Sequence, residues 1–145
     1  MTLILSLHPI GQLVAILFAC YAAFLGFQRT KSLHFGKVAR FLRQRHVIIG
    51  AIALISMLGG IVAGDIMVDT YLLKPDMTLH VVFAMVILAL GLVGISSGFL
   101  LYFKPKPRRI LPAVHGVNNL LLVIVSFAQI VTGAMAYLHY VLHWK

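Results

Sequence analysis

Apolar residues form four long runs along the chain, separated by three short polar segments. The runs cover residues of about 3–27, 45–68, 77–103 and 112–142. Each run is at least as long as the roughly 20 residues that an α-helix needs to cross a bilayer. The pattern therefore predicts an all-α membrane protein in which residues 1–145 form a single domain, a four-transmembrane-helix bundle. Pro112 suits the first turn of the last helix, where its missing N–H needs no partner.

The composition agrees with a membrane location. Hydrophobic residues make up 61% of the chain and charged residues 10%, with a mean hydropathy of +1.03, whereas soluble domains are about half apolar and a quarter charged. The first run lacks the basic start of a secretory signal and exceeds its apolar length, so we expect a retained helix. The single cysteine, Cys20, excludes an intramolecular disulfide and a CxxCH site for covalent haem attachment.

The net charge of +9 is concentrated in two of the three polar segments. These two segments contain no acid and carry Arg29, Lys31, Lys37, Arg40, Arg43, Arg45, Lys104, Lys106, Arg108 and Arg109. The middle segment carries Asp65, Asp69 and Asp76 against Lys74. Basic loops remain in the cytoplasm, so we expect both basic segments inside and the N-terminus, the acidic segment and the C-terminus outside. Orientation and contact with membrane lipid explain the charge, and no nucleic acid partner is expected.

The first basic segment has its own predicted structure. Residues 32–43 mix apolar and basic side chains. Such a composition is typical of a helix that lies in the headgroup region of a membrane. We therefore expect a short interfacial helix between the first two membrane spans.

Four of the seven histidines occupy equivalent places, within the first turn or two of successive predicted helices. They are His8, His46, His80 and His115. Neighbouring helices run in opposite directions, so helices one and three begin at one side of the membrane, and helices two and four at the other. We expect His8 to meet His80 near the outer face, and His46 to meet His115 near the cytoplasmic face. Ionisable groups inside a membrane are costly and usually functional.

Two imidazoles from facing helices suit both axial positions of a haem iron, and filling both leaves no site for oxygen chemistry. We therefore predict that these histidines are the iron ligands of two non-covalent haem b groups, held between alternate helices roughly 20 Å apart. Small residues at helical spacing from the histidines leave room for a macrocycle. Small residues on a helix face also allow membrane helices to pack closely. In a haem-binding bundle the same residues would serve both purposes, so the sequence does not separate them. These residues include Ala15, Ala19, Ala22, Gly26, Gly50, Ala53, Gly60, Gly64, Ala84, Gly91, Gly94, Gly98 and Gly133.

Four arginines flank the inner histidine pair and have two interpretations. They are candidates for holding haem propionates or an anionic reductant. Charge that sets the orientation of the chain explains them equally well. These residues are Arg43, Arg45, Arg108 and Arg109.

The other polar residues of the spans are less specific. His34 is expected in the headgroup region. His139 and His143 lie four residues apart, which favours surface residues on one helix face and also permits a metal site or contact with the outer haem. A polar stripe on the last helix can orient a ligand, bond another helix or line a quinone pocket. It consists of Asn118, Asn119, Ser126 and Gln129.

Short motifs around the histidines resemble those of cytochrome b-561 type membrane proteins. They are His8-Pro9, Arg45-His46, His80 near the start of the third helix, and Pro112-Ala113-Val114-His115-Gly116. The resemblance spans nearly the whole chain and implies a four-helix core with two haems between alternate helices. The third helix has Met77-Thr78-Leu79-His80-Val81-Val82 in place of the Ser-Leu-His-Ser-Trp setting of the ascorbate-reducible members. Quinol or a protein partner is therefore expected as the donor, rather than ascorbate.

The chain is also similar to a family of small four-helix membrane proteins of undetermined function, found in photosynthetic and other bacteria. The similarity implies a bacterial inner membrane, either cytoplasmic or photosynthetic. Quinone or quinol and other redox subunits are the implied partners. The motifs that carry it are His8-Pro9-Ile10, Gly26-Phe27-Gln28-Arg29-Thr30, Arg45-His46 with Gly50, Gly59-Gly60, and Gln129 with Thr132-Gly133.

Three functions remain open from the sequence. The first is transmembrane electron transfer by a di-haem b subunit of a larger redox complex. The second is a membrane anchor for soluble subunits, with one haem or none. The third is a metal or proton transporter using histidine relays, which is weakened by the shortage of membrane-embedded carboxylates, since only Asp65 lies near a helix interior.

Overall fold

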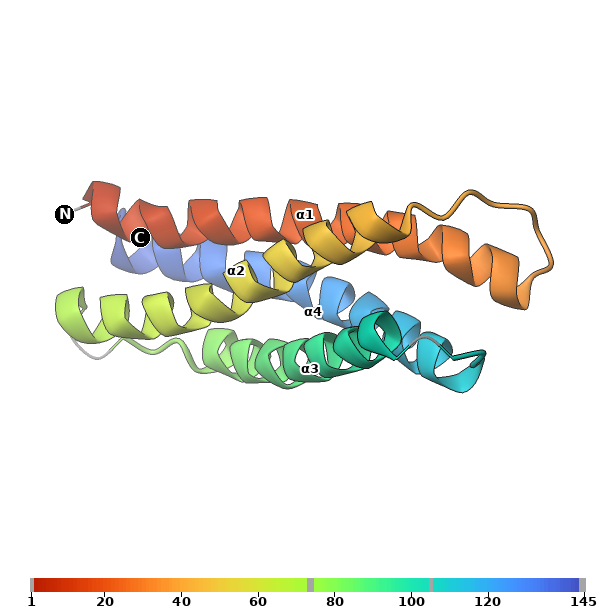
Figure 1. Cartoon of the computed structure of the whole chain (residues 1–145). Coiled ribbons are helices and arrows are strands. Elements are labelled where there is room, and N and C mark those ends of the chain that lie inside the picture. Colours follow the sequence, from red (N-terminus) through yellow and green to blue (C-terminus); the bar gives the residue numbers. More distant parts are fainter. Residues whose placement is uncertain (1, 73–74, 105, 144–145) are drawn as a thin grey trace.

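The structure is a computed structural model that describes residues 2–72, 75–104 and 106–143. Four helices form an antiparallel bundle (Figure 1): α1 (Thr2–His34), α2 (Arg43–Tyr71), α3 (Thr78–Phe103) and α4 (Ile110–Tyr140). Each is 26 to 33 residues long and contains an 18-residue window with a mean hydropathy of 2.0 to 2.5. All four helices are thus long and apolar enough to cross a membrane. The predicted all-α four-helix architecture is confirmed, and it fits a multi-pass integral membrane protein.

The bundle consists of two tightly packed hairpins. α1 packs mainly on α2, and α3 mainly on α4, while smaller α1–α4 and α2–α3 contacts close the bundle. Within the described ranges, the backbone of α1 makes no close contact with that of α3, and the backbone of α2 makes none with that of α4. These two pairs of helices therefore face each other across the diagonals of the bundle. We call the end where α1 and α3 begin the terminal end, and the end where α2 and α4 begin the basic end.

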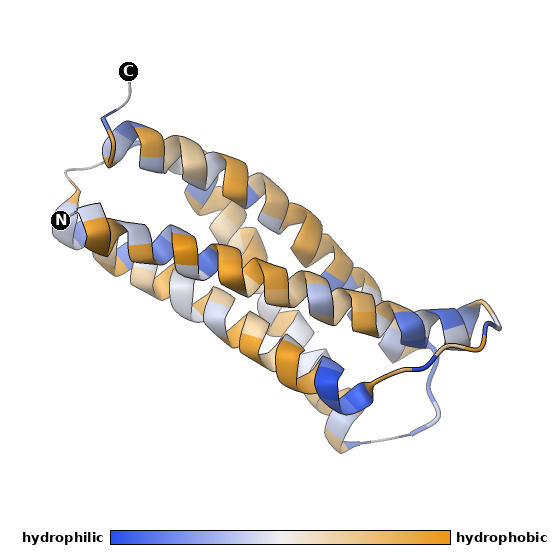
Figure 2. Ribbon diagram, turned by 90° about the horizontal axis from the view of Figure 1, so that it is seen from above, coloured by the Kyte–Doolittle hydropathy of each residue, from blue (hydrophilic) through white to orange (hydrophobic). Residues whose placement is uncertain are grey.

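The middle of the bundle is filled by apolar side chains, which we call the central layer. Met57 and Leu122 are each only 1% exposed. Large hydrophobic side chains also cover the outside of all four helices, as expected for contact with lipid tails. Figure 2 shows this apolar length and the hydrophilic residues at the basic end, where α1 ends and α2 begins. The central layer consists of Ala15, Ile16, Ala19, Ala53, Leu54, Met57, Ile87 and Leu122.

The main departure from the expected elements is at the end of α1. The helix continues through the polar residues that were expected to close it, and it ends at His34. Lys31 extends along the helix surface, with its Nζ 4.9 Å from the centroid of the Phe27 ring. Long basic side chains can follow a helix surface into the headgroup region, so a basic residue need not end the helix.

The expected interfacial helix over residues 32–43 is wrong. Its first three residues belong to α1, and residues 36–42 are not helical. Gly36 adopts a left-handed conformation with φ of +61°, which interrupts a right-handed helix. The N–H of Lys37 then donates to the Lys31 carbonyl at 3.2 Å and closes the end of α1. At α4, Pro112 lies in the first helical turn, as predicted.

Candidate functional site

Two pairs of half-buried histidines lie at opposite ends of the bundle. The ring centroids of His8 and His80 are 6.4 Å apart at the terminal end, with the ring planes at 77°. Those of His46 and His115 are 6.1 Å apart at the basic end, with the planes at 81°. Each pair joins two diagonal helices, so the pairing expected from the helix directions is confirmed. Haem ligation by these rings stays a prediction.

The position of each histidine in its helix explains why the rings gather at the ends. Side chains in an α-helix lean toward its N-terminus, so a residue in the first turns points toward the end of the bundle. His46 is the fourth residue of α2 and His80 the third residue of α3. At the basic end, Phe41 precedes α2 and places its ring 5.5 Å from the His46 ring. The connection between α1 and α2 therefore partly covers this pair.

The tautomer of His46 follows from its hydrogen bond to α1. Its Nδ1 lies 2.9 Å from the carbonyl oxygen of Ala22. A carbonyl oxygen only accepts, so Nδ1 carries the proton and donates it. In a neutral imidazole, Nε2 is then the nitrogen with a free lone pair. This is the arrangement that metal-binding histidines generally use, with the other ring nitrogen bonded to the protein.

His115 has the same tautomer through a serine of α3. The Ser97 hydroxyl donates to the Val93 carbonyl at 2.6 Å. Its single proton is thereby used, so Ser97 Oγ accepts from Nδ1 of His115 at 2.8 Å. In this tautomer Nε2 of His115 has the lone pair, and Nδ2 of Asn119 lies 3.5 Å from it. The side-chain amide of Asn119 lies beside this ring and donates to the His115 carbonyl at 2.7 Å.

At the terminal end, the two imidazoles differ in their partners. Nδ1 of His80 lies 3.2 Å from Thr132 Oγ1, and Nε2 of Gln129 donates to Nε2 of His80 at 3.2 Å. The Gln129 amide therefore occupies Nε2 of His80 and would have to turn aside if this nitrogen were to bind a metal. Nδ1 of His8 and Oε1 of Gln129 are buried without a hydrogen-bond partner. Buried polar atoms without a partner are rare, so these two atoms distinguish the terminal end from the basic end.

The spacing and number of these imidazoles are compatible with the two axial ligands that a haem would need. Two imidazoles bonded to one metal from opposite sides, at about 2.0 Å per bond, have centroids roughly 6 Å apart. Among the described residues, no three His, Cys, Asp or Glu side chains gather where they could hold a metal ion, whereas protein zinc sites use three or four. A porphyrin supplies four nitrogens of its own and needs only two axial ligands.

The candidate arginines lie at the basic end in different surroundings. Arg43 donates from Nη2 to the Tyr102 carbonyl at 2.9 Å, and its guanidinium carbon lies 5.0 Å from the Tyr102 ring centroid. It therefore joins the start of α2 to the end of α3. Arg45 is exposed. In the part of the chain that the structure describes, none of the four candidate arginines donates a hydrogen bond to an imidazole.

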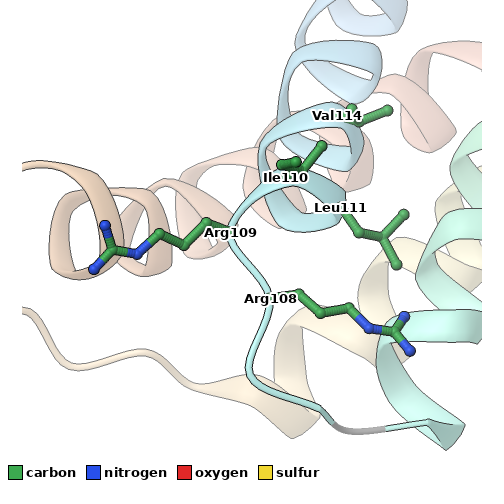
Figure 3. Close-up of a pocket in the computed structure, with 5 residues that line it drawn as sticks. All are labelled: Arg108, Arg109, Ile110, Leu111 and Val114. Carbon is green, nitrogen blue, oxygen red and sulfur yellow. The ribbon is translucent and has the colours of Figure 1, made fainter.

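Arg108 and Arg109 flank a shallow hollow of about 380 Å³ at the start of α4. Figure 3 shows their side chains pointing away from each other. No histidine lines this hollow, whose other lining residues are Ile110, Leu111 and Val114. The structure thus does not gather the four arginines into one cluster, and a role in binding haem propionates stays a prediction.

The other polar candidates lie in different surroundings, some exposed and some inside the bundle. His34, His139 and His143 are exposed. The expected common helix face of His139 and His143 is wrong, because α4 ends at Tyr140 and His143 has a φ of +53°. Within the polar stripe of α4, Asn118 bonds another helix, donating from Nδ2 to the Leu90 carbonyl at 2.9 Å.

The groups that orient the imidazoles were not predicted from the sequence. These are the Ala22 carbonyl, the Ser97 hydroxyl and the Thr132 hydroxyl. Each is supplied by the neighbouring helix of the same hairpin. A backbone carbonyl gives no sequence signal, while a serine or threonine inside a membrane helix is a weak one.

No protein-family model matches the chain, and comparisons with curated proteins and with solved structures likewise find no match. The resemblance to the cytochrome b-561 type therefore stays an expectation from short motifs, and the geometry of the histidine pairs is the main guide to function.

Proposed function

We propose that the chain is a di-haem b-type cytochrome that transfers electrons through a membrane. His8 and His80 would be the axial ligands of one haem, and His46 and His115 those of the other. One observation carries the proposal: two diagonal imidazole pairs, with centroids 6.4 and 6.1 Å apart, lie at opposite ends of an apolar four-helix bundle. Bound haem would supply an iron centre that gains and loses single electrons.

The side chains around the pairs would tune these centres. Two protein ligands at one iron leave no open coordination position, which favours electron transfer over oxygen chemistry. The hydrogen bonds from Nδ1 of His46 and His115 direct Nε2 into the site and make the imidazoles stronger electron donors. The apolar surroundings exclude water and lower the local dielectric constant.

The separation of the pairs suits a relay between two membrane faces. Ala22, whose carbonyl binds His46, follows His8 by 14 residues in α1. At the rise of an α-helix, this places the two pairs about 21 Å apart along the bundle. The hydrocarbon core of a bilayer is about 30 Å thick, so each pair would lie near one face.

The charge distribution supports an orientation and a class of partner. We place the basic end in the cytoplasm and both chain ends outside, in a bacterial inner membrane, either cytoplasmic or photosynthetic. Asp65, Asp69 and Asp76, the three acids of the chain, are exposed near the terminal end. Quinone or quinol in the membrane, or another subunit of a redox complex, would exchange electrons with the haems. Arg43, Arg45, Arg108 and Arg109 remain candidates for the haem propionates.

The structure gives less support to a transporter. A proton relay through the membrane usually depends on embedded carboxylates. All three acids of this chain are exposed, and the central layer that includes Met57 and Leu122 is apolar. A membrane anchor with one haem or none differs from the proposed cytochrome only in its cofactor content, which can be measured directly.

The test is the haem content of the purified protein in detergent, measured by the pyridine haemochrome assay. We expect two haem b per chain, with the low-spin spectrum of two axial imidazoles. Replacing His8 or His80 by Ala should remove the haem of the terminal end, and His46→Ala or His115→Ala that of the basic end. His34→Ala, at an exposed position, is the control. A colourless protein with intact helicity would rule out the cytochrome, and a complex that keeps its activity without haem would indicate an anchor.

A further inference from the structure

Each of the four imidazoles lies against a glycine of the neighbouring helix in its own hairpin. In the first hairpin, a Cβ added at Gly64 of α2 would lie 2.7 Å from Cε1 of His8. A Cβ added at Gly26 of α1 would lie 2.9 Å from Cε1 of His46. Both distances are well below van der Waals contact. The two rings therefore occupy space that exists only because these positions are glycine.

The second hairpin repeats the arrangement. A Cβ added at Gly133 of α4 would lie 3.0 Å from Cε1 of His80. A Cβ added at Gly98 of α3 would lie 3.2 Å from Cε1 of His115. In each hairpin, then, each helix carries one of the histidines and one of the glycines. The imidazole of each helix packs against the glycine of the other.

A constant spacing in the sequence underlies this reciprocity. In every helix, the glycine follows the histidine by 18 residues. Eighteen residues are five turns of an α-helix, so the two residues share one face and lie about 27 Å apart. Glycine makes up only 12 of the 145 residues, so its recurrence at all four positions is not expected by chance. The four couples are His8 with Gly26, His46 with Gly64, His80 with Gly98, and His115 with Gly133.

The hydrogen-bond acceptors of the rings lie beside the same glycines. Ser97 immediately precedes Gly98, and Thr132 immediately precedes Gly133. Ala22, the acceptor for His46, lies one helical turn before Gly26. One helix segment therefore fixes each of these three rings in two ways, through a close contact with the glycine and through a bond to Nδ1.

We propose that Gly26, Gly64, Gly98 and Gly133 are positioning residues that set the orientation of the four imidazoles. The inference rests on the proposed haem function, because the rings are the axial ligands there. Each haem site would then draw on all four helices, with two supplying histidine and two supplying glycine. A Cβ at Gly26 or Gly64 would force the ring to shift, and one at Gly98 or Gly133 would require the ring to give by a few tenths of an ångström. At His46, His80 and His115 this displacement would weaken the Nδ1 hydrogen bond. The orientation and hydrogen bonding of an axial imidazole tune the iron that it binds.

The test uses the four Gly→Ala variants, with Gly11→Ala and Gly59→Ala as matched controls. A Cβ at either control position would meet nothing within 4 Å. Alanine favours a helix more than glycine does, so a loss cannot come from weaker helix formation. Haem content, midpoint potential and the electron paramagnetic resonance signal of each ferric haem are measured, and the His→Ala variants assign each signal to its end.

We expect each substitution to act only on the haem of its own end. Gly64→Ala and Gly133→Ala should shift the signal and potential at the terminal end, or lower haem affinity there by about 10- to 100-fold. Gly26→Ala and Gly98→Ala should do the same at the basic end. The effect should be largest for Gly64→Ala, which has the shortest contact, and smallest for Gly98→Ala. Two unchanged haems in all four variants would overturn the proposal.

A second measurement separates this proposal from the proposed haem function. Nitrogen NMR of the histidine rings in haem-free protein reports the tautomer and the Nδ1 hydrogen bond. Gly26→Ala should change the ring signals of His46, and Gly98→Ala those of His115, while Gly59→Ala changes none. Unchanged ring signals in folded variants would overturn the positioning role. A wild-type protein that never binds haem would instead rule out the proposed cytochrome. The NMR measurement on haem-free protein would still show whether the glycines position the rings.

Discussion

The Nδ1 N–H of His115 donates to Ser97 Oγ at 2.8 Å, across the contact between α4 and α3. The Ser97 hydroxyl donates in turn to the Val93 carbonyl at 2.6 Å. The backbone of one helix thereby fixes the tautomer of a ring on the next. A partner of this kind makes an imidazole a stronger donor to a metal.

Replacing Ser97 by Ala should therefore weaken the proposed haem site at the basic end. Nδ1 of His115 loses its acceptor, the ring becomes a poorer donor, and the ferric state loses stability. We expect a raised midpoint potential for that haem and an affinity lower by about 10- to 100-fold, measured by redox titration and haem binding. The neighbouring Ser96→Ala is the control, because Ser96 is exposed and bonds only the Leu92 carbonyl. Equal behaviour of the two variants would contradict the role of Ser97.

Tyr140 fastens the connection between α2 and α3 to the end of α4. Its hydroxyl donates to the Asp76 carbonyl at 3.1 Å and accepts from the Asp76 N–H at 2.8 Å. Tyr140→Phe removes both bonds, each worth about 1 kcal/mol, so hydrogen exchange of the Asp76 amide should accelerate by about tenfold or more. Tyr71→Phe, at an exposed tyrosine that ends α2, should leave this rate unchanged. An unaltered rate in Tyr140→Phe would show that other contacts hold the connection.

Gly36 ends α1 with a left-handed backbone conformation, at φ of +61°. Gly36→Ala should lower the free energy of unfolding by about 1–2 kcal/mol, because Cβ crowds the carbonyl in this conformation. The measurement is denaturant unfolding in detergent. Gly11→Ala, inside α1 with open space around its Cα, should be neutral or stabilising by up to about 1 kcal/mol. A longer α1 without loss of stability would be the contrary result.

The orientation can be checked by labelling single cysteines in intact cells. In a Cys20→Ala background, Val38→Cys and Asp76→Cys place a thiol at exposed positions of the two opposite ends. A membrane-impermeant maleimide should label Asp76→Cys and spare Val38→Cys until the cells are opened, since basic loops remain in the cytoplasm. The reverse pattern would invert the proposed orientation.

Hydropathy and helix direction were sufficient to predict the four helices and the diagonal meeting of His8 with His80 and of His46 with His115. Both follow from the order of the apolar runs and from where each histidine lies in its run. The length of α1 was underestimated, because Lys31 lies along the surface of the helix beside Phe27 and does not end it.

Contacts between particular side chains were harder to predict. Ser97 and Thr132 reach an imidazole only because of the rotation of each helix about its axis, which the apolar pattern of a lipid-exposed helix does not define. The four glycines did have a signal, the constant distance of five helical turns from each histidine. When each glycine is considered separately, close helix packing explains it equally well, so only the fourfold recurrence is informative.

The central layer has a consequence for energy conversion. Met57 and Leu122 are buried between the two histidine pairs, so if the chain transfers electrons as proposed, this apolar layer would disfavour protons following an electron from one end to the other. A negative charge would therefore travel alone through most of the membrane voltage, which is worth about 2.3 kcal/mol per elementary charge for each 100 mV. Under the proposed electron-transfer function, a current through the protein would either charge the membrane or be driven by the membrane voltage, depending on its direction.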